Sequence, residues 1–150
     1  MANDIGMIKM IELYMAELSI ALPAETVLEI IEPKQTQPLP KTPPAIEGVF
    51  HLRGEVYALI DLYLIASGQP LSANTGKYII INPPTTSTYA LHVSGVSRML
   101  ESTSMPLQES VATNLSNIES MADGVIQADN ASLLLLNPDH LFNAIRNQPS

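Results

Sequence analysis

The sequence predicts an all-β fold with short helices, built from two similar halves. Short apolar runs alternate with turn-forming residues along most of the 150 residues, a pattern typical of β-sandwiches and β-barrels. The second observation is a weak internal repeat, in which GVFHLRGEVYALID at 48–61 lies over GVIQADNASLLLLN at 124–137 without a gap. Upstream, LSIAL at 18–22 lies over YALHV at 89–93. Two successive copies of one supersecondary unit indicate a duplicated architecture.

The composition excludes several classes of protein. Hydrophobic residues make up 46% of the chain and charged residues 15%, as in folded rather than disordered proteins. Seven basic against fifteen acidic residues give a net charge of −8, which argues against binding to nucleic acid or to an anionic membrane surface. The absence of cysteine excludes disulfides and thiol-based metal or redox sites. Since no export signal or bilayer-length apolar run is visible, we expect a cytoplasmic protein without direct membrane insertion.

The N-terminal part is expected to form a hairpin, a helical turn and a loop. Apolar runs at 7–14 and 18–22 flank a short connection, which favours a hairpin. Pro23 can begin a helical turn that the following ETVLEII continues. Five prolines in the segment 33–44 remove N–H donors and restrict φ, so an extended loop is predicted there. Its PLPKTPP core can also be interpreted as a polyproline ligand for a recognition module, which is the less favoured alternative.

A second hairpin follows the Pro-rich loop. Apolar runs at 49–52 and 56–60 flank the pair Arg53–Gly54, so a tight turn is expected between them. A short helix or turn is expected at 62–66, and Gly68 and Pro70 end it.

Two more hairpins are expected in the second half of the chain. Apolar runs at 77–82 and 89–93 bracket the turn-rich PPTTST, and runs at 125–128 and 132–136 flank Asp129–Asn130. Between these hairpins, the polar residues 101–121 show only weak periodicity and predict no clear element.

The two repeat units end in matching helix caps. Asp61 closes the first unit and Asn137 the second, and both side chains can accept hydrogen bonds from backbone amides of a following helix. Pro138 at the first helical position and Asp139 in the first turn strengthen the second signal. We assign Asp61 and Asn137 a structural role.

The three histidines, at positions 51, 92 and 140, predict neither a metal site nor a catalytic centre. They share no ligand spacing and have no cysteine cluster beside them. Ser94 near His92 and Asp61 near His51 could be assembled into a hydrolase, but no Gly-x-Ser-x-Gly elbow accompanies them. No Gly-rich phosphate loop is present. We therefore predict no catalytic residue, no metal and no cofactor, and a small hydrolase or metal enzyme is the alternative.

Two charges in apolar surroundings are the strongest candidates for a site. Glu29 lies within VLEII, and Arg53 stands where a tight turn favours Asn or Asp. An unpaired carboxylate near apolar surface is costly and a guanidinium can satisfy it, so we hypothesise that they pair. The alternative is that both point into water. Because the second hairpin has Asp129–Asn130 at the corresponding turn, the fold does not require arginine there. This difference favours a partner contact for Arg53.

One long segment resembles the CheW-like domain. The stretch TPPAIEGVFHLRGEVYALIDL at 42–62 is similar to the family pattern TPxxIxGVxNLRGxVxPVIDL, with His51 and Ala58 replacing Asn and Pro. VLEII, the Pro-rich loop and the closing GVIQADNASLLLLNPDHLF follow the order seen in the family, and the resemblance runs from about Ile8 to Phe142. It implies two small five-stranded β-barrel subdomains, packed together and interleaved, in a single domain that spans 1–150.

The resemblance also implies a function. CheW-like domains are non-enzymatic bacterial adaptors that couple the tip of a methyl-accepting chemoreceptor to the regulatory domain of a CheA-type histidine kinase. Matched position by position, Val27, Glu29, Arg53 and Val56 become the candidate partner-binding residues. The surface near Val56 and Leu59 is implied to face either the core or the kinase. The system served is either chemotaxis or twitching motility driven by type IV pili.

Two departures from the family pattern suggest an alternative function. The usual VDxV segment is VSGV here, with Ser94 in place of Asp, and the closing LLLLD is LLLLN, with Asn137 in place of Asp. Because the receptor-facing surface involves both subdomains, these changes suggest a divergent accessory protein that binds the kinase but not receptors.

Overall fold

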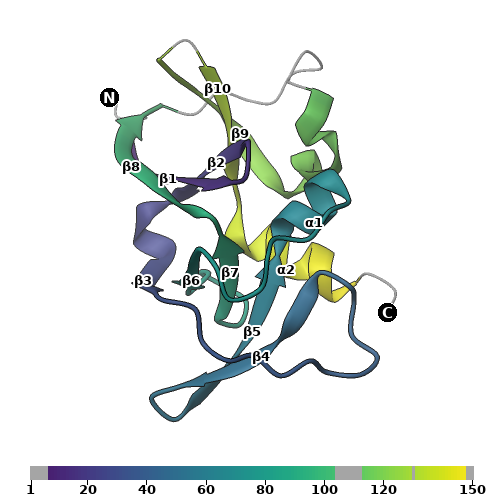
Figure 1. Ribbon diagram of the computed structural model, residues 1–150. Coiled ribbons are helices and arrows are strands. Elements are labelled where there is room, and N and C mark those ends of the chain that lie inside the picture. Colours follow the sequence, from purple (N-terminus) through teal and green to yellow (C-terminus); the bar gives the residue numbers. More distant parts are fainter. Residues whose placement is uncertain (1–6, 104–112, 130, 148–150) are drawn as a thin grey trace.

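The computed structural model describes residues 7–103, 113–129 and 131–147, which form two five-stranded sheets and four short helical segments (Figure 1). The first sheet has the order β8 (Gly95–Ser102), β1 (Ile8–Met15), β2 (Leu18–Pro23), β10 (Ala131–Leu136) and β9 (Ala122–Ala128). The second has the order β3 (Val27–Ile31), β6 (Lys77–Ile81), β7 (Tyr89–Val93), β5 (Glu55–Asp61) and β4 (Ile46–Leu52). The helical segments are η1 (Ala24–Thr26), α1 (Leu62–Ser67), η2 (Thr113–Met121) and α2 (Pro138–Arg146).

Each sheet combines strands from both halves of the chain. The hairpin β9–β10 joins the first sheet through a parallel pairing of β10 with β2, and the hairpin β4–β5 joins the second through a parallel pairing of β5 with β7. If β1 to β5 are exchanged in order with β6 to β10, the strand order of one sheet becomes that of the other. The internal repeat of the sequence therefore corresponds to a repeat of topology.

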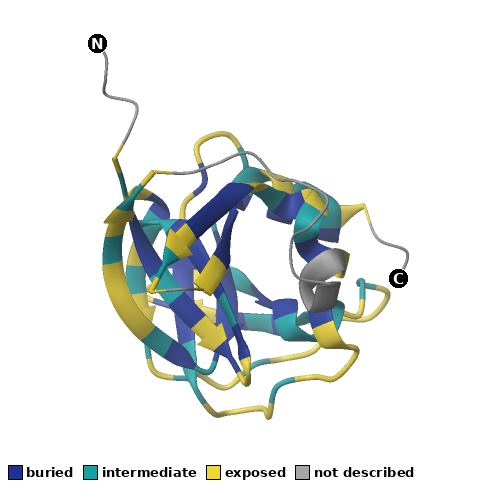
Figure 2. Ribbon diagram, turned by 90° about the horizontal axis from the view of Figure 1, so that it is seen from above, coloured by how far each residue is buried: buried dark blue, intermediate teal, exposed yellow. Residues whose placement is uncertain are grey.

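The core explains why several strands are apolar at every position. Ile79 and Leu134 belong to the largest buried cluster, which draws on both sheets and on the helices. Their neighbours Ile80 and Leu135 belong to two smaller clusters, one built by each sheet. Because successive side chains point to opposite faces of a strand, both faces of these strands are buried. Buried residues accordingly line the strand interiors, while the connections are largely exposed (Figure 2).

The predicted all-β class with two five-stranded units is confirmed. Among the described residues, ladder pairing stops at β3 and β4 in one sheet and at β8 and β9 in the other. Among these residues, no backbone pairing between the edge strands closes either sheet into the predicted barrel. Each sheet still covers a small buried cluster of its own.

The prediction of a helical turn continuing through VLEII is wrong. The helical turn is limited to η1, and Val27–Ile31 form the edge strand β3, which pairs antiparallel with β6. Three of these five residues are β-branched, and such side chains pack well on a pleated sheet. Pairing with β6 supplies partners for the backbone N–H and C=O groups that a one-turn helix would leave open.

The Pro-rich segment is an extended connection, as predicted, and it covers the outer edge of β4. The backbone N–H of Gln37 donates to the Val49 carbonyl at 2.8 Å, and the Val49 N–H donates back to the Gln37 carbonyl at 2.8 Å. Gly48 permits this approach, because a Cβ there would lie 2.3 Å from the Gln37 carbonyl oxygen.

The four predicted hairpins and both terminal helix caps are confirmed. Asp61 accepts from the Leu64 N–H at 3.1 Å, and Asn137 accepts from the Asp139 N–H at 2.9 Å. In the stretch 101–121, β8 runs to Ser102 and η2 begins at Thr113, while 104–112 lie outside the described residues. None of the helices in the described part of the chain is long and apolar enough to cross a membrane.

Candidate partner-binding surface

Arg53 occupies a backbone conformation that arginine rarely adopts. With Gly54 it forms the two-residue turn between β4 and β5, and their φ angles are 50° and 84°. Positive φ at both central positions is the signature of the tight hairpin turns that favour Asn, Asp or Gly. A long side chain at such a turn carries a backbone cost of about 1–2 kcal/mol, which its contacts must offset.

The Arg53 guanidinium forms an ion pair with Glu29. Its Nη2 donates to the Glu29 Oε1, so the pairing hypothesis is confirmed and the alternative, that both point into water, is wrong. Glu29 lies on the edge strand β3 and Arg53 at the end of the opposite edge strand β4, so the pair bridges the two edges of one sheet. The side chains are 37% and 65% exposed, so the pair contributes only about 0–1 kcal/mol to stability.

The other candidates divide between surface and core. Val56 lies near the same turn with 56% of its surface exposed, whereas Leu59 is fully buried. Of these two residues only Val56 lies at the surface, and Leu59 belongs to the core. Val27 is half-buried and packs against the largest core cluster.

Two exposed apolar residues near this site were missed in the sequence. Leu28 and Ile30 are 58% and 43% exposed, and they alternate along β3 with Glu29. Interpreted as a strand, VLEII would have placed them on the face opposite Glu29, because side chains alternate in β-strands. Because the segment was expected to be a helical turn, the exposure of Leu28 and Ile30 was not predicted.

The second hairpin carries an equivalent ion pair of opposite polarity. Arg53 lies over Asp129 in the sequence repeat, and Asp129 has the same φ of 50°. The Asp129 carboxylate accepts from Nη1 of Arg98 on the edge strand β8, and the Arg98 Nε also donates to Glu12 at 2.8 Å. An ion pair between turn and edge strand is thus common to both sheets. The second turn therefore forms without arginine, but it carries a charge that is paired with an edge strand, as Arg53 does.

The hydrolase constellation considered in the sequence does not form. The Ser94 Oγ accepts from the Ala16 N–H at 2.8 Å and so fixes the β1–β2 turn. Asp61 accepts from the Leu64 and Leu71 amides, and burial raises the pKa of its carboxyl group although these hydrogen bonds oppose the change. His51 is exposed on β4. Within the described residues, no cluster of three or more acidic or histidine side chains could hold a metal.

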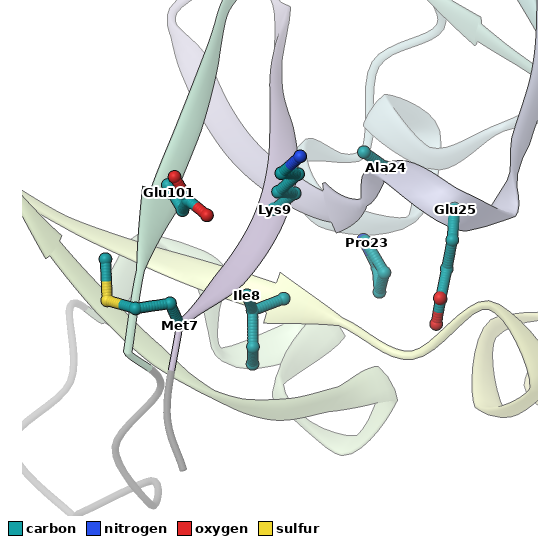
Figure 3. A pocket seen from close by; sticks show the side chains of 7 residues that line it. All are labelled: Met7, Ile8, Lys9, Pro23, Ala24, Glu25 and Glu101. Carbon is teal, nitrogen blue, oxygen red and sulfur yellow. The ribbon is translucent and has the colours of Figure 1, made fainter. Parts of the chain in front are cut away.

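A surface pocket of about 630 Å³ lies away from these residues (Figure 3). It is formed where the start of β1, the end of β2, η1 and the end of β8 meet, and its charged lining consists of Lys9, Glu25 and Glu101. Glu25 and Glu101 lie on opposite sides of Lys9 in the view of Figure 3. No predicted site residue lines it.

A family model now gives these features a context, because the model of the CheW-like domain matches residues 9–146. The chain belongs to the CheW-like domain family. The crystal structure of scaffolding protein TtCheW from Thermoanaerobacter tengcongensis is similar, with a TM-score of 0.73 and 22% sequence identity. That match covers 87% of this chain and 88% of the other, and at this identity it supports the fold. A comparison with curated proteins gave no match.

Membership of the CheW-like family decides whether the chain is an enzyme. CheW-like scaffolding proteins are non-enzymatic, so the prediction that the chain is not an enzyme is confirmed. In this CheW-like domain the LRG turn of the family pattern is the β4–β5 turn, and the VLEII segment is the edge strand β3. The two motifs are joined by the ion pair between Glu29 and Arg53.

Proposed function

We propose that this chain is a cytoplasmic CheW-like adaptor that couples the tip of a methyl-accepting chemoreceptor to the regulatory domain of a CheA-type histidine kinase. The system served is either chemotaxis or type IV pilus-driven twitching motility. Binding two partners at once raises their effective concentration for each other, so each interface can be modest. We also propose that residues 1–150 act as one domain, because each sheet takes strands from both halves of the chain.

The observation that carries the proposal is the exposed Glu29–Arg53 pair beside the exposed apolar side chain of Val56. Both family motifs contribute to it, and both charged side chains stay accessible. Val56 on β5 adds apolar surface close to the turn. A charged group that anchors a partner next to apolar surface is typical of an interface centre, where arginine is enriched. Val27, which is half-buried, would act by supporting β3.

The test separates the guanidinium from the turn that carries it. Arg53→Asn removes the cation but keeps a residue that tolerates left-handed φ, whereas Arg53→Ala removes the cation and keeps the strain. Both variants should bind the kinase regulatory domain and the receptor tip more weakly, by about tenfold for at least one partner, or roughly 1.4 kcal/mol. Binding of each partner is measured separately by calorimetry, with the circular dichroism spectrum as a check of the fold.

A charge exchange provides the matched control. Glu29→Arg with Arg53→Asp gives the first hairpin the polarity that Arg98 and Asp129 have in the second. If the pair serves only the fold, this double variant should bind both partners as the unaltered chain does. Restored binding would therefore contradict a direct role of Arg53, and unchanged binding of Arg53→Asn would contradict the proposed surface.

The alternative function, an accessory protein that binds the kinase but not receptors, rests on the departures at Ser94 and Asn137. Both residues make local contacts: Ser94 fixes the β1–β2 turn and Asn137 caps α2. These roles account for the two side chains without a change of partner, so we favour the adaptor. Receptor-tip binding by the unaltered chain distinguishes the two functions directly.

A further inference from the structure

A buried histidine on β7 has no part in the proposed function. The His92 side chain is fully buried, and both ring nitrogens contact acceptors. Nε2 lies 2.8 Å from the backbone carbonyl oxygen of Thr75, and Nδ1 contacts Oε1 of Glu47. A carbonyl oxygen only accepts hydrogen bonds, so Nε2 carries a proton. If Glu47 is ionised, Nδ1 must carry one as well.

The groups around the ring are acidic or neutral. Glu47 comes from β4 and its side chain remains 20% exposed, so its carboxylate keeps access to solvent. Asp61 comes from β5, opposite His92 in the parallel register, and its carboxylate is held by two backbone amides. Tyr78 on β6 meets the ring edge-on with 5.3 Å between centroids. Two carboxylates therefore act on the ring, and none of these facing groups is a cation.

The electrostatic balance favours the charged ring. Burial on its own lowers the pKa of His92, but the hydrogen bonds to Glu47 and Thr75 and the charges of Glu47 and Asp61 outweigh it, so the pKa lies above the ordinary value. The ring contacts Thr75, and the next residue, Gly76, is tightly packed. A Cβ at Gly76 would lie 2.1 Å from the Val93 carbonyl oxygen. Thr75 and Gly76 thus run directly against β7.

We propose that His92 is a doubly protonated clasp that holds the connection before β6 and the beginning of β4 against β7. The imidazolium donates to Thr75 from Nε2 and to Glu47 from Nδ1. When one proton is lost to solvent, the neutral ring keeps a single N–H, and two carboxylates then face it without a counterion. The Glu47 contact is the one that opens, and it lies on the strand that leads to the Arg53 turn.

The sign of the pH dependence follows from the direction of the pKa change. The folded state holds the proton more tightly than the unfolded chain, whose histidine titrates at about pH 6.5. The stabilisation by the clasp is therefore complete below that pH. It is lost as the pH rises through the higher pKa of the folded state.

The test is a titration of the intact chain by ¹⁵N NMR of the imidazole rings. His92 should show both ring nitrogens protonated at about pH 6, and its midpoint should lie above the ordinary histidine value of about 6.5. The amide signals of Thr75 and Gly76 should change with the His92 midpoint. An unprotonated Nδ1 at about pH 6, or a His92 midpoint at or below about 6.5, would overturn the proposal.

Two variants separate the clasp from general effects of charge. Glu47→Gln removes the anionic acceptor but preserves the shape of the side chain, so the His92 midpoint should shift downwards. His140→Gln removes an exposed histidine that lies 4.0 Å from Asp123, and it should leave the His92 midpoint unchanged. A His92 midpoint that does not move in Glu47→Gln contradicts the clasp. If that variant does not fold, the titration of the unaltered chain decides the matter.

Discussion

Arg53 and Asp129 occupy the same place in the two halves of the fold and carry opposite charges. Each has a φ of 50° at a hairpin turn, and each reaches an oppositely charged residue on an edge strand. In both halves the turn residue pairs with a residue on an edge strand, but the charge of the turn residue is reversed. A partner that recognises charged groups would therefore distinguish the two hairpins, although their backbones are equivalent.

The stability of the chain should depend little on Arg53. Arg53→Asn removes an exposed ion pair worth about 0–1 kcal/mol and relieves strain at a left-handed position, so the two effects nearly cancel. We expect the free energy of unfolding in urea to change by less than about 1 kcal/mol. A much larger loss would mean that the pair holds the sheet edges together, and the binding results would then report on the fold.

Gly48 is expected to tolerate no side chain. In Gly48→Ala the new Cβ would meet the Gln37 carbonyl oxygen at 2.3 Å and the Thr36 Cγ2 at 2.8 Å. Overpacking of this kind costs about 1–3 kcal/mol, which urea unfolding should detect. Gly54→Asn is the matched control, because nothing lies within 4 Å of a Cβ there and asparagine tolerates positive φ. Equal midpoints for the two variants would mean that the Pro-rich segment does not lie against β4.

At the scale of the element, the first turn of α2 holds the β6–β7 connection. The Asp139 carboxylate accepts from the Thr86 N–H at 2.9 Å, from the Thr86 hydroxyl at 2.7 Å and from the Thr85 N–H at 3.2 Å. Desolvation alone would raise the pKa of this carboxyl group, but the hydrogen bonds from Thr86 and Thr85 outweigh it and lower the pKa. The helix start and the hairpin loop are thus linked by one ionised side chain.

This link should weaken only in acid. Because the pKa of Asp139 is lower in the folded state, its stabilisation is present above the ordinary pKa of about 4 and is lost as the pH falls through the folded value. The Thr85 and Thr86 amide resonances should therefore shift together below pH 4, and Asp139→Asn should abolish that shared transition. Amide signals that titrate unchanged in the variant would exclude Asp139 as the group responsible.

The strand β3 shows how an element depends on its neighbours. VLEII is short, and its apolar positions fit either one helical turn or an edge strand. The presence of β6 beside it, which lies far along the chain, supplies the ladder partners that favour the strand. The same change of element explains the exposure of Leu28 and Ile30.

At the scale of the whole molecule, the exchange of strands between halves predicts cooperative unfolding. Neither sheet can form from one half alone, because the parallel pairs β10–β2 and β5–β7 join segments from different halves. The methyl signals of Ile80 and Leu135, which report on the two small clusters, should be lost at the same urea concentration. Two separated transitions would show that the sheets are independent folding units.

Much of the fold was predictable because its signals are local. Alternating apolar runs, the turn pair Arg53–Gly54, and the caps Asp61 and Asn137 are each encoded within a few residues. The long motif at 42–62 identified the family on the same local basis. The candidate site was predictable in part, since Glu29 and Arg53 were each singled out by a charge in apolar surroundings.

The sequence by itself therefore determined the class, the hairpins, the repeat and the family. The tertiary structure decided that VLEII is a strand, that Arg98 and Asp129 repeat the ion pair with reversed polarity, and that His92 is buried between Glu47 and Thr75. These features join residues 17 to 54 positions apart along the chain. Their contacts depend on the order of strands in the sheets, which no local pattern specifies.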